Sequence, residues 1–151
     1  MKQTVSVEEG FVISLIFFLD LWSIIKPNVL TLSGDSPSTH KLFFLDVCTG
    51  FESSAEWNEA IFRSKKIPKQ SQKQLKLNMD DLFLSATEFC KLHNERYEGR
   101  LDYALHLLES MKNDPKKYLP EWTVWKNAIN KVLVEHITLC DFDWSDELPE
   151  W

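Results

Sequence analysis

Apolar residues recur every three or four positions along most of the chain, which is the spacing of one helical face. Five segments with this pattern are predicted to be helices: residues 5–25, about 53–64, 79–97, 100–112 and 121–136. Residues 42–47 (LFFLDV) are too few for periodicity to decide between a short strand and more helix. The pattern therefore predicts an all-α fold of about five to seven helices.

Start and stop signals support these predicted helix boundaries. Ser6 and Glu9 have the S-x-x-E form of a capping box, in which side chain and backbone satisfy each other at a helix N-terminus. Asn78 with Asp81 resembles a cap at the start of the second long helix. Pro27 is expected to end the first helix, because the residue before a proline disfavours helical backbone angles.

The chain contains an internal repeat. Residues 5–64 and 77–136 both begin with the order apolar, acid, acid, any residue, Phe, and have a further Phe six positions on. Each then closes with a Trp-centred helix, EWNEAI in the first half and VWKNAI in the second. Repeats at a fixed spacing are typical of stacked supersecondary units. We therefore expect a single compact helical domain of two pseudo-repeated halves, joined by a basic linker over residues 65–76.

Composition agrees with one domain, and the charge is uneven. The 151 residues are 44% hydrophobic and 26% charged, which is ordinary for a globular chain that folds on its own core. The formal net charge is −6, yet Arg63–Lys76 holds six Lys or Arg and no acid, while Glu135–Trp151 holds six acids and no Lys or Arg. The basic run lacks interleaved aromatics on which bases stack, so we interpret it as a solvated connection without direct nucleic-acid contact.

Residues 11–25 (FVISLIFFLDLWSII) raise a signal peptide or a membrane anchor as alternatives to a buried helix. The stretch contains Asp20 and is shorter than the about 20 residues that a spanning helix needs. Glu8 and Glu9 precede it in place of the basic residues of a signal peptide. We therefore expect a buried helix, no membrane partner and a cytoplasmic location.

No motif for catalysis, metal binding or cofactor binding stands out. The three cysteines have no close pair, and the four histidines show no metal-binding spacing. No Gly-rich phosphate loop is present. A nucleophilic pair of Cys90 with His136 stays open, although Cys90 lies on an apolar helix face and no Gly-rich elbow supplies an oxyanion hole. We expect a protein that is not an enzyme, with reduced core thiols, no metal and no cofactor.

The acidic aromatic tail, residues 137–151, is the segment that best fits a binding role. The side chains that we expect to contact a partner are Asp141, Asp143, Trp144, Asp146 and Glu147. Aromatic side chains anchor interfaces, and carboxylates steer the chain toward a basic surface. The alternative is a tail whose aromatics tuck onto the core while its acids stay solvated.

The helix start at residues 7–11 (VEEGF), followed by Phe17, Phe18 and Leu19, resembles the small helical immunity proteins of bacterial polymorphic-toxin systems, including contact-dependent growth inhibition. Many of these carry an E-E-[GA]-[FY] helix start, an F-L pair and a D-P-x-x-W-x-x-W-x-x-x-[IV] helix. Both halves of this chain have the first Trp and the final apolar residue of that helix, as Trp57 with Ile61 and Trp125 with Ile129. The resemblance covers the chain to about His136.

The chain departs from the family pattern in its Trp helices. Glu52-Ser53 and Leu119-Pro120 stand in place of the Asp-Pro, and Ala60 and Ala128 stand in place of the second Trp. The resemblance implies an inhibitor that binds the C-terminal domain of a cognate toxin and blocks its active site or substrate surface. Nucleases are the expected toxin class, and their basic clefts suit an acidic binder.

Three functional hypotheses follow from these observations. The first is a monomeric immunity protein that neutralises its cognate toxin by 1:1 binding. The second is a helical adaptor or regulatory protein that binds another basic protein, which the sequence hardly separates from the first. The third is a hydrolase with a site at Cys90 or at Asp80–Asp81, which requires a deep polar pocket at one of those places.

Overall fold

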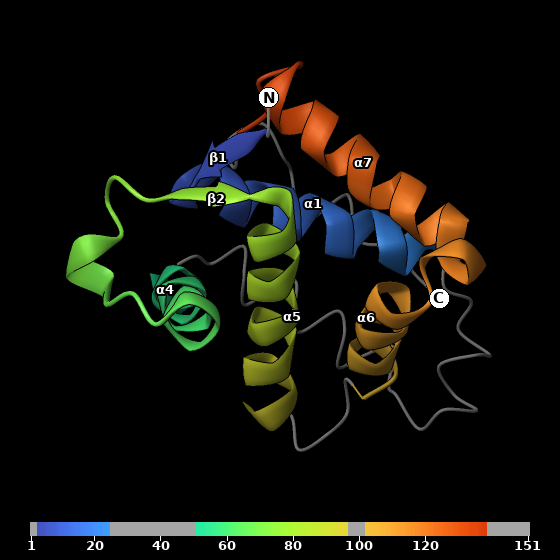
Figure 1. Cartoon of the computed structure of the whole chain (residues 1–151), viewed down its shortest axis with the longest axis horizontal. Helices are drawn as coiled ribbons and strands as arrows, with labels where there is room; N and C mark the ends of the chain where they lie inside the picture. The colour runs from blue at the N-terminus through green and yellow to red at the C-terminus, as the bar shows by residue number, and fades with distance from the viewer. Residues whose placement is uncertain (1–2, 25–50, 97–101, 139–151) are drawn as a thin grey trace.

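A computed structural model describes residues 3–24, 51–96 and 102–138 (Figure 1). Residues 42–47, for which strand and helix were both open, therefore lie outside the described residues, as does most of the acidic aromatic tail. Within the described residues the chain is mostly helical and compact, with one short two-stranded sheet, so the predicted all-α class is confirmed.

Five α-helices and two short 3₁₀ turns account for most of the described residues. The α-helices are α1 (Val7–Ile24), α4 (Phe51–Lys65), α5 (Met79–Arg96), α6 (Asp102–Asn113) and α7 (Leu119–Leu133). The 3₁₀ turns are η1 (Lys69–Ser71), between α4 and α5, and η2 (Pro115–Tyr118), between α6 and α7. None of the described helices is long and apolar enough to cross a membrane.

Two three-residue strands correct the sequence-based boundaries. β1 (Thr4–Ser6) pairs antiparallel with β2 (Lys76–Asn78), and Val5 lies directly opposite Leu77. The first helix therefore begins at Val7, not at residue 5, and residues 65–76 are not a plain linker, because they include the end of α4, the turn η1 and the start of β2. Strands of three residues are too short to show the alternation by which strands are recognised in a sequence.

Each strand ends at the cap of the helix that follows it. The Ser6 amide donates to Glu9 Oε1 at 2.9 Å and the Glu9 amide donates to Ser6 Oγ at 3.1 Å, which is the predicted capping box. The Asp81 amide donates to Asn78 Oδ1 at 2.8 Å, which confirms the predicted cap of α5. Because the caps follow paired strands, the sheet fixes where both long helices start.

Each Trp-bearing helix packs against the long helix of the other half. α4 lies against α5, and α7 lies against α1, while α6 packs beside α5 (Figure 1). The two halves that the repeat defines are thus interleaved in space and do not form separate lobes.

Six aromatic rings form the centre of the core, with each tryptophan between one ring from α1 and one ring from α5. The rings belong to Phe11 and Phe17 of α1, Phe83 and Phe89 of α5, Trp57 of α4 and Trp125 of α7. Trp57 lies 5.9 Å from Phe11 and 5.7 Å from Phe89, between ring centroids. Trp125 lies 5.0 Å from Phe17 and 5.2 Å from Phe83. The Phe11–Trp57 pair is tilted and the other three pairs are edge-to-face, and edge-to-face contacts stabilise beyond the apolar area that they bury.

The aromatic contacts follow the spacing of the sequence repeat. Phe83 and Phe89 stand 72 positions after Phe11 and Phe17, and Val5 pairs with Leu77, which is also 72 positions later. The two halves therefore meet around a local pseudo-twofold arrangement. That they descend from one duplicated unit stays a prediction.

Gly10 permits the close approach of α1 to α5. A Cβ atom at this buried position would lie 2.8 Å from Leu82 Cδ1 and 3.3 Å from Trp57 Cζ2. Both neighbours are almost fully buried, so neither side chain has free space into which it could move.

We predict that Gly10→Val destabilises the protein. Its two γ-methyl groups would overpack the contact with Leu82, and overpacking costs about 1–3 kcal/mol of the free energy of unfolding. Urea denaturation followed by circular dichroism measures the change. Gly10→Ala is the matched control, because better helix propensity of about 1 kcal/mol offsets part of its smaller clash. Unchanged stability of Gly10→Val would show that the helices are not in close contact here.

Candidate functional site

The predicted contact residues of the acidic aromatic tail, Asp141, Asp143, Trp144, Asp146 and Glu147, lie outside the described residues. The structure describes how the chain leaves α7 toward them. His136 has a positive φ of 57°, and the Ile137 amide donates to the Lys131 carbonyl at 3.0 Å. This hydrogen bond spans residues 131–137, and together with the left-handed backbone of His136 it turns the chain at the end of α7.

The candidate nucleophile Cys90 is in no disulfide and lies in the core, only 2% exposed, whereas its candidate partner His136 is exposed. One turn after Cys90, the fully buried His93 contacts Glu56 of α4, with 2.5 Å between Nε2 and Oε2. This contact joins α4 to α5, and the imidazole also packs on the Phe89 ring. The sequence gives no sign that His93 and Glu56 are neighbours, because 37 positions separate them.

The acidic pair Asp80–Asp81 is divided between two environments. Asp81 forms an ion pair with Lys65 at 2.8 Å, which ties the end of α4 to the first turn of α5. Asp80 is exposed and lines a shallow cavity of about 260 Å³ together with Gln3, Asn78 and Met79. Within the described ranges, no group of three His, Cys, Asp or Glu side chains is placed to hold a metal ion.

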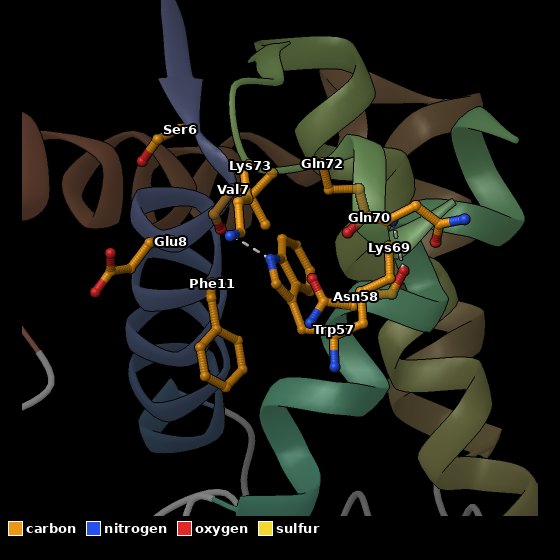
Figure 2. Close-up of a pocket in the computed structure, with 10 residues that line it drawn as sticks. All are labelled: Ser6, Val7, Glu8, Phe11, Trp57, Asn58, Lys69, Gln70, Gln72 and Lys73. Atoms are coloured by element: carbon orange, nitrogen blue, oxygen red, sulfur yellow. Dashed lines mark hydrogen bonds between the residues drawn. The ribbon is translucent and has the colours of Figure 1, made fainter. Parts of the chain in front are cut away.

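A groove lies between the N-terminus of α1, the Trp57 region of α4 and the turn η1. It has a volume of about 730 Å³, and we call it the α1–η1 groove (Figure 2). Its lining residues are Ser6, Val7, Glu8 and Phe11 of β1 and α1, Trp57 and Asn58 of α4, and Lys69, Gln70, Gln72 and Lys73 of the η1 region. The floor is apolar and the η1 side is cationic.

Trp57 and Gln72 hold the walls of the α1–η1 groove together. The Trp57 indole N–H donates to the Val7 carbonyl at 2.9 Å, across from α4 to α1 (Figure 2). Gln72 is 2% exposed, and its Nε2 donates to the Asn58 carbonyl at 3.0 Å and to the Ile67 carbonyl at 2.8 Å. The amide of Gln72 therefore fastens the η1 region onto α4.

The basic run is structured, and most of its cations are exposed. Arg63 contacts Glu59 and Glu95, at 3.6 and 3.4 Å, and Lys65 contacts Asp81. The other four cations, Lys66, Lys69, Lys73 and Lys76, are exposed, and none of them has a carboxylate within 4 Å among the described residues. We interpreted this run as a solvated connection and did not predict that Gln72 fastens it to α4, because nothing in the sequence shows that one Gln in a polar stretch is buried.

Comparisons with models of known protein families, with curated protein sequences and with solved structures found nothing that matches the chain.

We predict that Gln72→Leu releases the η1 region from α4. The variant has a similar side-chain volume but loses both hydrogen bonds to main-chain carbonyls. A buried acceptor that loses its donor costs about 1–3 kcal/mol of the free energy of unfolding. Amide hydrogen exchange of residues 66–75 measures the release. Gln70→Leu, on the exposed side of the same turn, is the control and should leave exchange unchanged. Equal exchange in both variants would contradict the role of the Gln72 clamp.

Proposed function

We propose that this chain is a cytoplasmic immunity protein that binds the toxic domain of a cognate secreted toxin, with a nuclease as the expected toxin class. The resemblance of its helix starts and Trp helices to helical immunity proteins supports this proposal. So does the mostly helical fold, whose two Trp helices flank one aromatic core. The toxin would be blocked at its active site or substrate surface.

The observation that carries the proposal is the separation of charge along the chain. Six acids and no Lys or Arg lie in Glu135–Trp151, with aromatic residues between them. Nuclease clefts are basic because they bind a polyanion, so a segment rich in carboxylates is complementary to them. The described end of α7 supports an accessible origin for this segment, since Val134, Glu135 and His136 are all exposed.

An adaptor that binds another basic protein would show the same charge pattern, so the test must score neutralisation as well as binding. Candidate toxin domains are co-expressed with the chain, and growth and co-purification are recorded. An immunity protein restores growth and co-purifies with one toxin domain. An adaptor leaves growth arrested with every toxin domain, which would contradict the proposal.

We predict that reversing two tail acids weakens toxin binding at least about tenfold, because like charges would then face the basic surface. The variant is Asp143→Lys with Asp146→Lys, and titration calorimetry against the rescued toxin domain measures the dissociation constant. The matched control is Glu109→Lys with Asp114→Lys, which changes the net charge equally at exposed positions on α6 and before η2. Equal weakening by both variants would show that only net charge matters and that the tail is not the contact surface.

A further inference from the structure

The α1–η1 groove combines an apolar floor with a cationic edge, which the acidic aromatic tail and the proposed toxin contact leave unexplained. Phe11 and Trp57 form the floor, and both are almost fully buried. Lys69 and Lys73 line the edge, are exposed, and have no carboxylate within 4 Å among the described residues. Lys66 and Lys76 of the same basic run are also exposed. In a chain with a net charge of −6, this run is therefore a local excess of positive charge.

The two walls of the groove carry opposite charges. Glu8 lines it from α1, and Figure 2 shows its side chain extending to the side of α1 that faces away from the η1 region. Lys69 and Lys73 approach from the opposite wall, which Gln72 fastens to α4. A ligand with negative charge is therefore attracted to the η1 wall and repelled from the outer side of α1.

We propose that the α1–η1 groove docks an acidic, extended segment of a partner protein, with an apolar side chain over the Phe11–Trp57 floor and carboxylates against Lys69 and Lys73. The volume of about 730 Å³ accommodates a few residues of such a segment. The described residues that line the groove do not belong to the acidic aromatic tail, so the proposal does not rest on the proposed function.

A protein segment fits the groove better than a nucleic acid does. Single-stranded nucleic acids bind by stacking bases on exposed aromatic faces along a basic channel. Trp57 is 2% exposed and Phe11 is 6% exposed, so each ring leaves only a small apolar surface in the groove, which suits contact with an aliphatic side chain and is too small for a base to stack on. The overall charge of −6 also repels a long polyanion, whereas a short acidic peptide interacts mainly with the local lysines, within about one Debye length of 10 Å.

The test uses the full-length chain and a fluorescein-labelled nine-residue peptide in which acidic residues alternate with Leu and Phe. Fluorescence anisotropy measures binding at about 50 mM and 300 mM NaCl. We expect saturable binding with a dissociation constant below about 1 mM, weaker at the higher salt. The same peptide with Gln and Asn in place of its acids should bind at least about tenfold more weakly.

Two charge variants with the same change in net charge decide the location. Lys69→Glu with Lys73→Glu should weaken binding at least about tenfold, whereas Lys112→Glu with Lys116→Glu, at exposed positions on α6 and η2, should change it less than about twofold. Circular dichroism checks that both variants keep their helices. The proposal is overturned by no saturable binding, by equal weakening in both variants, or by an oligothymidylate of matched charge binding as tightly as the peptide.

Discussion

The two tryptophans that bridge α1 and α5 are the contacts on which the rest of the structure depends. Trp57 lies between Phe11 and Phe89, and Trp125 lies between Phe17 and Phe83, so each indole touches both long helices. The paired strands β1 and β2 set the relative start of these helices, and Gly10 lets them approach. α4 and α7 are then held in place by the residues that they insert, since each carries one of the bridging indoles.

The chain carries a cationic segment after α4 and an acidic segment after α7. Trp57 also donates to the Val7 carbonyl, so the edge of the core continues into the α1–η1 groove, where Gln72 fastens a cationic turn. Farther along the chain, the left-handed backbone of His136 and the hydrogen bond from the Ile137 amide to the Lys131 carbonyl turn the chain after α7, where the acidic aromatic tail begins. A core built from two similar halves thus carries a basic surface on one connection and an acidic segment after the last helix.

Sequence reasoning recovered what is local and periodic. The helices and both caps follow from spacing and from short motifs, which depend on neighbours within about four residues. The β1–β2 pairing, the Glu56–His93 contact and the Gln72 clamp were missed because each joins residues whose types give no signal of their partner. The sequence shows that this run is cationic, but which of its lysines meet a carboxylate depends on contacts in three dimensions. The tail residues Asp141, Asp143, Trp144, Asp146 and Glu147 stay a prediction.

We propose that the acidic aromatic tail after α7 steers the protein to a basic toxin surface. The salt dependence of the association rate tests it most directly, because steering acts on the encounter and is screened by ions. Stopped-flow mixing of the chain with the toxin domain that it rescues gives this rate. If the tail steers the encounter, the association rate falls at least about tenfold between about 20 mM and 500 mM NaCl, with a much smaller change in the dissociation rate. An association rate that is independent of salt would contradict it.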